Sequence, residues 1–165
     1  SIMAVEDKYA DANLEAGKLA TAAFNHGDKT VYAVAIAEVA AADDNGSVYR
    51  FLRIPSNAAV KSIKVWNDAI TGGTDYDLGL YTPNGGAVID KDLLHDGQTF
   101  ATAASRTAPK ILFGAVARED IGKRLWELAG YTVENKPAFF DVAFTANTVG
   151  TADGTISYIA EFVQG

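Results

Sequence analysis

The sequence predicts an all-β fold of the β-sandwich or jelly-roll type, with one short late helix and an extended N-terminal arm. Three observations predict it. Apolar residues alternate with polar ones in runs that recur from residue 30 to residue 163, as expected for strands with one buried face. Turn signals rich in Gly, Asn, Asp and Pro separate these runs at regular spacing. One stretch late in the chain has helical spacing. We therefore expect an arm at residues 1–28 and a β-sandwich domain at residues 29–165.

The composition limits the classes of fold and partner. A chain of 165 residues is long enough for one domain, which buries roughly 70% of the surface of its unfolded chain. The net charge is -7 and the basic residues form no block, so we expect no nucleic-acid partner. There are no cysteines, which excludes disulfides and thiolate zinc sites. We expect no membrane partner and no export by a secretory signal, because the chain has no long apolar run and its first residues lack the signal pattern.

Residues 1–28 are rich in alanine and acidic residues and have only a weak helical stripe. We interpret them as an arm that a partner orders, because terminal segments are poorly ordered unless something holds them. The alternative is a short surface helix packed on its own domain, and the sequence leaves both open.

The first expected strand, residues 30–39, is apolar on both faces, with Tyr32 and Val34 on one face and alanines on the other. Such a strand is covered on both sides, and either the arm or another subunit could supply the second cover. An Asn-Gly pair at residues 45–46 favours a tight hairpin. We therefore expect this strand to lead by a hairpin turn into the next strand, residues 47–54.

The centre of the chain, residues 60–81, is predicted to form a hairpin with a polar turn at residues 67–74. Residues 87–110 have no clear period apart from one helical turn at residues 92–95. Because long irregular loops in compact domains tend to be functional, this region is a candidate recognition surface.

The clearest helix is expected at residues 120–129, capped by Asp120 and ended by Gly130. We expect Leu125 and Trp126 to pack it onto the sheet. Its apolar face is expected to hold Ile121, Leu125 and Leu128.

Two more strands are expected near the C-terminus, at residues 140–146 and 156–162, with a turn at residues 152–154. The expected core combines inward positions of the central hairpin with those of these two strands. They are Ile63, Val65, Leu78, Leu80, Val142, Phe144, Tyr158 and Phe162.

No group of residues predicts catalysis. The two histidines, His26 and His95, lack a second partner at fixed spacing and are interpreted as solvated loop residues. The carboxylates fall in predicted turns, where Asp accepts local backbone hydrogen bonds; they are Asp43, Asp44, Asp68, Asp75, Asp77, Asp90, Asp92 and Asp96. The sequence contains no nucleophile elbow, phosphate loop or complete calcium loop. We predict no enzyme, no catalytic residue, no cofactor and no metal ligand.

Two stretches resemble small structural proteins of tailed bacteriophages. One is Ser47-Val48-Tyr49-Arg50-Phe51-Leu52-Arg53-Ile54-Pro55, which leads towards Tyr76-Asp77-Leu78-Gly79-Leu80-Tyr81. The other is Ile121-Gly122-Lys123-Arg124-Leu125-Trp126-Glu127-Leu128-Ala129-Gly130-Tyr131, which leads into the last two strands. Together they resemble the head decoration, or capsid cement, proteins over residues 47–162.

The resemblance implies a virion structural protein that binds the assembled phage head and stabilises it. It implies the major capsid protein as partner, a homo-oligomeric state, a place on the capsid surface and assembly in the host cytoplasm. A phage fibre or carbohydrate-binding module with the same fold is the alternative, with Trp66 and Trp126 as candidate platforms for sugars.

Overall fold

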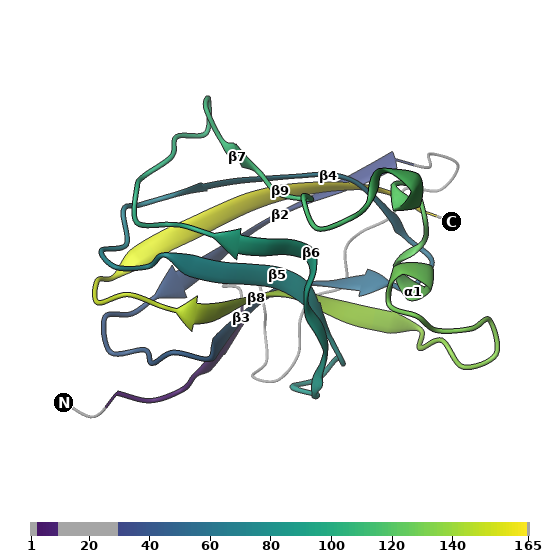
Figure 1. Cartoon of the computed structure of the whole chain (residues 1–165), viewed down its shortest axis with the longest axis horizontal. Helices are drawn as coiled ribbons and strands as arrows, with labels where there is room; N and C mark the ends of the chain where they lie inside the picture. Colours follow the sequence, from purple (N-terminus) through teal and green to yellow (C-terminus); the bar gives the residue numbers. More distant parts are fainter. Residues whose placement is uncertain (1–2, 10–29, 165) are drawn as a thin grey trace.

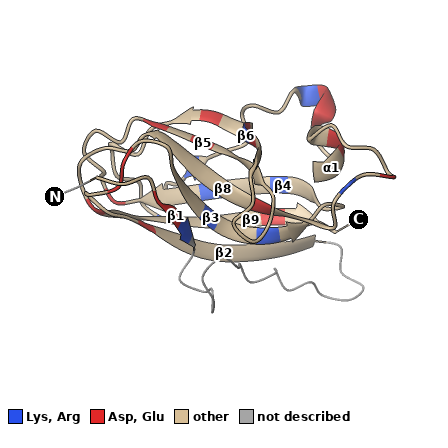
Figure 2. Ribbon diagram, turned by 90° about the horizontal axis from the view of Figure 1, so that it is seen from below, with Lys and Arg blue, Asp and Glu red and all other residues tan. Residues whose placement is uncertain are grey.

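Two β-sheets packed face to face form the protein, which confirms the predicted all-β sandwich (Figures 1 and 2). The computed structural model describes residues 3–9 and 30–164. The five-stranded sheet contains, in spatial order, β1 (Asp7–Tyr9), β3 (Ser47–Pro55), β8 (Phe139–Thr148), β5 (Asp75–Tyr81) and β6 (Val88–Gln98). The four-stranded sheet contains, in spatial order, β2 (Thr30–Val39), β9 (Gly154–Val163), β4 (Ala59–Asn67) and β7 (Lys110–Ile111). The described helices are η1 (Arg118–Asp120) and α1 (Leu125–Leu128). None of them has the length and apolar character needed to cross a membrane.

Consecutive strands mostly lie in opposite sheets, so the chain crosses between the layers at almost every turn. Among the described strands, only β5 and β6 are neighbours both in sequence and in a sheet. The hairpin predicted at residues 60–81 is therefore wrong, and so is the hairpin predicted for β2 with β3. The turn predicted at residues 152–154 connects β8 and β9 of different sheets. Alternation shows which side chains face inward. Strands that face each other across a core alternate as strongly as strands of one hairpin, so alternation does not distinguish the two arrangements.

The loop between β4 and β5 closes one end of the core. Ile70 in this loop is fully buried, and its N–H donates to the carbonyl oxygen of Phe100 at 2.9 Å. Asn67 is also buried, and its Nδ2 donates to the same carbonyl oxygen at 3.1 Å. The tip of a tight hairpin would leave both side chains in solvent. Because both side chains are buried, this segment crosses from the sheet of β4 to the sheet of β5 and does not form the tip of a hairpin.

The core between the sheets is rich in aromatic rings. Phe51 of β3 contacts Tyr158 of β9 across the layers, with ring centroids 4.5 Å apart. It also contacts Phe144 of β8, at 4.9 Å. Such edge-to-face contacts contribute about 0.5–1.5 kcal/mol beyond the burial of area. Every residue predicted for the core is buried: Ile63, Val65, Leu78, Leu80, Val142, Phe144, Tyr158 and Phe162.

The region predicted to be irregular, residues 87–110, contains β6. The register of β6 against β5 shifts repeatedly, and its backbone passes close to Gly79 of β5. A methyl group at Gly79 would clash with the backbone carbonyl oxygen of Asp90. Bulges shift the period-two alternation, so the strand was missed and the helical turn predicted at residues 92–95 is wrong.

The late helix is much shorter than predicted, because the stretch at residues 120–129 contains only the end of η1 and the single turn of α1. Between them Gly122 has a φ of 96°, a left-handed conformation that interrupts a helix. Arg124, and not Asp120, caps α1. Leu125 is fully buried as predicted, whereas Ile121 is 58% exposed.

Most of the predicted arm lies outside the described residues, and its boundary at residue 28 stays a prediction. The described part, residues 3–9, contributes β1, which pairs in parallel with β3. This segment is therefore a strand of the five-stranded sheet.

Candidate interaction surface

The four-stranded sheet has a partly apolar outer face, on the side away from the core. On β2, Tyr32 is 69% exposed and Val34 is 56% exposed. Their neighbours Val31 and Ala35 are buried on the core side. The described chain does not supply the second cover that the sequence predicts for this strand. Cover by the arm or by another subunit stays a prediction.

Cross-strand neighbours extend this face from one edge of the sheet to the other. Val34 lies opposite Ile159 of β9, and Ile159 lies opposite Lys64 of β4. Lys64 in turn lies opposite Ile111 of β7, which is 70% exposed. We define the outer face by Tyr32, Val34, Lys64, Trp66, Ile111 and Ile159. Five of these six side chains are apolar or aromatic, while Glu161 opposite Tyr32 and Ser157 opposite Trp66 add polar groups to the same face. A mixed face of this kind suits a protein partner.

Strand β2 forms one edge of this sheet. Its ten residues pair with β9 in one register, from Thr30 opposite Val163 to Val39 opposite Gly154, with no shift. Within the described ranges no other strand pairs with β2, and Glu38 is its one charged residue. Figure 2 shows β2 tan along most of its length. The edge presents a long, regular row of backbone N–H and C=O groups.

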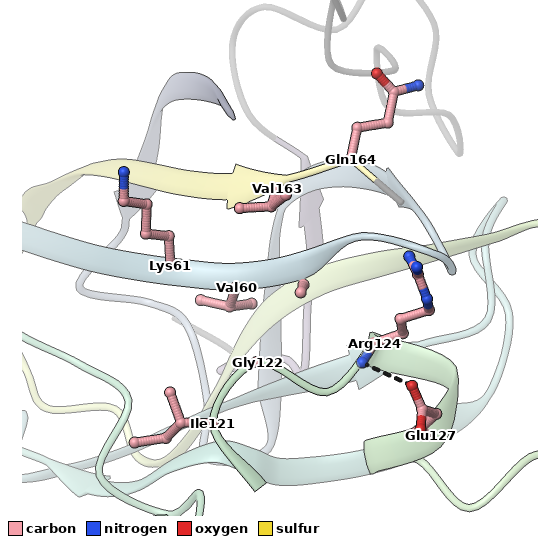
Figure 3. A pocket seen from close by; sticks show the side chains of 9 residues that line it. Val60, Lys61, Ile121, Gly122, Arg124, Glu127, Val163 and Gln164 are labelled. Atoms are coloured by element: carbon pink, nitrogen blue, oxygen red, sulfur yellow. Dashed lines mark hydrogen bonds between the residues drawn. The ribbon is translucent and has the colours of Figure 1, made fainter. Parts of the chain in front are cut away.

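A groove lies between the end of this sheet and the segment before α1 (Figure 3). Its volume is about 560 Å³. Val60, Val163 and Ile121 supply apolar lining, and Lys61 and Arg124 supply positive charge. Glu127 also lines the groove, so two cations and one carboxylate leave it with a net charge of +1 on a chain whose net charge is -7. It suits a chain segment that combines an apolar side chain with a carboxylate.

Hydrogen bonds hold the basic side of the groove in place. Arg124 donates from Nη1 to the carbonyl oxygen of Asn57 at 2.8 Å. Its backbone N–H donates to Oε1 of Glu127 at 3.2 Å. The guanidinium is thereby fixed beside the groove before any partner arrives, which reduces the entropy lost on binding.

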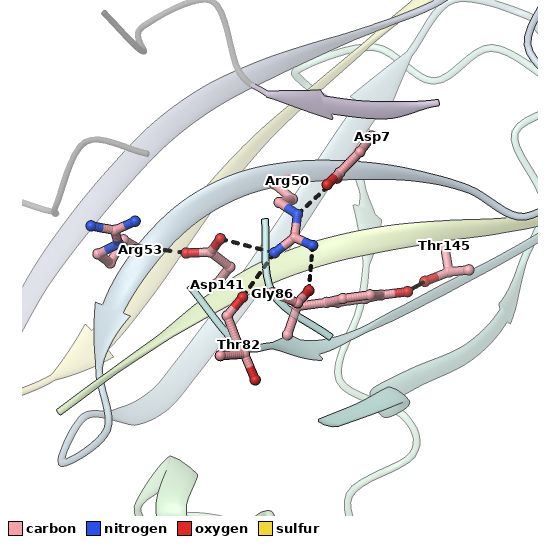
Figure 4. A network of polar contacts seen from close by, with 8 residues as sticks. Asp7, Arg50, Arg53, Thr82, Gly86, Asp141 and Thr145 are labelled. Carbon is pink, nitrogen blue, oxygen red and sulfur yellow. Dashed lines mark hydrogen bonds and ion pairs between the residues drawn. The ribbon is translucent and has the colours of Figure 1, made fainter. Parts of the chain in front are cut away.

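A buried ion-pair network joins β1 to the five-stranded sheet (Figure 4). Arg50 of β3 is 2% exposed, and its guanidinium donates to Asp7 at 2.8 Å and to Asp141 at 3.1 Å. It also donates to the carbonyl oxygens of Thr82 and Gly86. Burial raises the pKa of Asp141, and the hydrogen bond and charge of Arg50 oppose that shift. The network is internal to the fold and holds the N-terminal segment on the sheet.

Three carboxylates gather between β5 and β6. Asp77, Asp92 and Asp96 each offer one oxygen, and these oxygens lie within 4.8 Å of one another. Asp77 is buried and already accepts hydrogen bonds from Nδ2 of Asn147 at 2.6 Å and from the N–H of Gly97 at 3.0 Å. A hydrogen bond to Asp77 and its charge raise the pKa of Asp96. Asp77 therefore joins β6 to β8, and its oxygens are used within the fold.

The turns predicted for the carboxylates are correct only in part. Asp44 lies in a turn and accepts from the N–H of Asn45 at 2.8 Å. Asp43 is buried and accepts from the hydroxyl of Tyr49 at 2.7 Å. Asp68 accepts from the N–H of Thr155 at 3.0 Å. The turn prediction is wrong for those that lie in strands β5 and β6: Asp75, Asp77, Asp90, Asp92 and Asp96.

His95 lies in β6 and not in a loop, and its Nδ1 accepts from the N–H of Gly114 at 3.2 Å. His26 falls outside the described residues. Trp126 is half-buried, and Nζ of Lys136 lies 5.4 Å from the centre of its ring. That ring already has a cationic partner, which disfavours it as a platform for sugars.

Solved structures show a likeness to capsid assemblies of two phages. A chain described as "Capsid of Ralstonia phage GP4" matches with a TM-score of 0.62 and 14% identity, covering 100% of this chain and 99% of that one. A chain described as "Cyanophage Pam1 capsid asymmetric unit" has a TM-score of 0.49 and 15% identity, with coverages of 94% and 99%. No family model matches the chain, and no curated protein does. The first match shows that the sandwich fold is shared over the full length of both chains.

The sequence singled out Tyr32 and Val34 but missed the groove. Ile121 was placed on a buried helical face because it lies at helical spacing from Leu125 and Leu128. Gly122, directly after it, was the available signal, since glycine favours the left-handed turn found there.

Proposed function

We propose that this chain is a structural protein of a phage virion that binds the assembled head as a decoration, or cement, protein. The observation that carries this proposal is the likeness to a chain of the Ralstonia phage GP4 capsid, with a TM-score of 0.62 over the full length of both chains. Because the match covers both chains almost completely, the whole chain, and not only a part of it, is comparable to one chain of that capsid. The resemblance of residues 47–162 to decoration proteins points the same way.

The partner in this proposal is the major capsid protein, and the site is the groove together with the outer face. The groove offers apolar lining from Val60 and Ile121, with positive charge from Lys61 and Arg124. A capsid segment that carries an apolar side chain next to a carboxylate complements it. Charge complementarity of this kind orients a partner and speeds its association. The protein stabilises the shell by bridging subunits and performs no chemistry.

Many weak contacts on a symmetric shell act together. Each decorating copy raises the effective concentration of its remaining contacts once the first has formed. The protein is then a homo-oligomer on the capsid surface, and it adds to heads that assemble in the host cytoplasm. Residues 1–28 contribute in this proposal by extending across a subunit boundary.

Co-sedimentation with purified heads that lack the protein tests this function. Ile121→Asp places a carboxylate in the groove and should weaken binding at least about tenfold, which corresponds to about 1.4 kcal/mol. Val133→Asp is the matched control, because Val133 is 64% exposed and does not line the groove. Equal binding by both variants would remove the groove from the contact. Absence of binding by the unmodified chain, together with retention on a glycan array, would replace the cement function by the carbohydrate one.

The arm needs its own control, because removal of residues 1–28 also removes β1. Such a truncation loses the ion pair between Asp7 and Arg50 as well as any contact with the shell. Asp7→Asn weakens that ion pair and keeps the remaining residues. If the truncated chain binds heads as well as Asp7→Asn does, the arm has no part in binding.

A further inference from the structure

We propose that the edge of β2 that pairs with no other described strand pairs in an antiparallel arrangement with β2 of a second copy, so that the two four-stranded sheets become one continuous sheet. The pairing would use the backbone groups of residues 31–37 in both copies. Dimerisation of this kind requires no shell and therefore goes beyond the proposed binding to heads.

The other sheet edges are blocked in ways that β2 is not. β1 has three residues and β7 has two, which leaves few groups to pair. β6 is long, but its register shifts repeatedly, and Asp90, Lys91 and Asp92 place charges along it. Short strands, irregular registers and charges are the means by which proteins prevent pairing at an edge. β2 has ten residues in one unbroken register.

The sequence of β2 is complementary to itself in the antiparallel direction. A two-fold axis at Val34 places Val34 opposite Val34 and Tyr32 opposite Ile36. Residues that lie directly opposite in antiparallel strands point to the same side of the sheet. This register therefore continues the outer face across the axis, and it keeps Val31 and Ala37 on the core side, where both are buried. An aromatic side chain opposite a β-branched one is a favourable cross-strand pair.

The charge on β2 favours a second copy as the occupant even though the chain carries a net charge of -7. Glu38 is the one charged residue of the strand, and it lies near one end. In the antiparallel register it faces Thr30 of the second copy. The two Glu38 side chains are then roughly 27 Å apart along the strands, at about 3.4 Å per residue. That separation exceeds the Debye length of about 8 Å at physiological ionic strength, so two acidic chains meet at β2 with little repulsion.

The test measures molar mass by light scattering after size exclusion, with the full chain over a wide range of concentration. The unmodified chain should form dimers as concentration rises. Val34→Lys places two ammonium groups opposite each other at the axis, so it should stay monomeric, and so should Val34→Glu. A mixture of the two variants should recover the dimer, because Lys then faces Glu. Recovery by mixing depends on the register and cannot result from misfolding of either variant.

Ile111→Lys is the matched control. Ile111 is exposed on the same outer face but on β7, at the opposite edge. This variant should dimerise like the unmodified chain. Loss of the dimer in this variant, with the dimer retained in Val34→Lys, would assign the contact to the other edge and overturn the proposal.

The absence of native cysteine offers a second test. Val34→Cys should form an intermolecular disulfide under mild oxidation, because directly opposite residues have Cα atoms about 4.5–5.5 Å apart, within the range of disulfides. Ile111→Cys should not form one at the same rate. An unmodified chain that stays monomeric at every concentration overturns the proposal.

Discussion

The two long edge strands of the sandwich, β2 and β6, differ in the regularity of their register and in the charges that they carry. β2 has ten residues and β6 has eleven, so their lengths are similar. β2 keeps one register against β9, whereas β6 shifts register against β5 between Tyr76 and Leu78 and again further along. β6 also carries carboxylates at Asp90, Asp92 and Asp96.

Position at the edge of a sheet therefore does not by itself make a strand an interface. Bulges and charges prevent a second strand from pairing with β6. Asp77 of β5 also holds β6 in its own sheet, because it accepts hydrogen bonds from Gly97 of β6 and Asn147 of β8. β2 has neither feature in its central part. We therefore regard β6 as closed to partner strands and β2 as open to one.

The largest expected effect is a loss of stability when the core shared by both edge strands is disrupted. Phe144 is fully buried and contacts Phe51 and Phe100. Phe144→Ala should lower the free energy of unfolding by about 3–5 kcal/mol, because it removes a large apolar side chain and leaves a cavity. Urea denaturation measures this loss. Amide hydrogen exchange should then speed up in β2 and β6 together, and faster exchange in β6 alone would mean that the edges unfold independently.

How far the sequence predicts this fold can be seen by comparing β9 with β6. β9 keeps strict alternation, so Tyr158 and Phe162 were correctly placed in the core. β6 contains bulges, and its alternation is lost in the sequence. Pairing was not predictable even for regular strands. Alternation fixes the face that each side chain occupies but not the sheet to which its strand belongs.

The candidate site was predictable to the same degree. Tyr32 and Val34 stood out because their strand is apolar on both faces, and this is a local property of the sequence. The groove brings Val60 and Lys61 of β4 together with Ile121 and Val163. Such a site depends on how distant segments pack, and a period read along one segment carries no information about that.

The next expected effect concerns the side of the sandwich that we regard as closed. Gly79→Ala should lower the free energy of unfolding by about 1–3 kcal/mol or more, because the new methyl group would meet backbone atoms of Asp90 and Lys91. Those atoms belong to β6 and cannot move aside as a flexible side chain can. Val34→Ala on the exposed face of β2 is the comparison, with an expected change within about 0.5 kcal/mol. Equal losses in thermal unfolding for both variants would contradict the close contact between β5 and β6.

The smallest expected effect is a pH dependence confined to β6. Burial lowers the pKa of His95 from its ordinary value of 6.5, while a hydrogen bond with Gln98 and the charges of Asp96 and Asp77 oppose the shift. The folded protein therefore favours the neutral imidazole, whose Nδ1 accepts from Gly114.

Between the folded pKa and 6.5 the unfolded chain binds more protons than the folded one at His95. The stability that His95 contributes is thus complete above 6.5 and is lost as pH falls through the lowered pKa. The pKa values of Asp90 and Asp96 are raised, so these groups act in the opposite direction and contribute equally in the unmodified protein and in His95→Gln. Melting temperatures measured from about pH 8 to about pH 5 should fall more for the unmodified protein than for His95→Gln, which has no titrating group at this position. Parallel curves would show that the contact of His95 with Gly114 does not depend on its protonation, and β6 would then be held by its backbone and carboxylates alone.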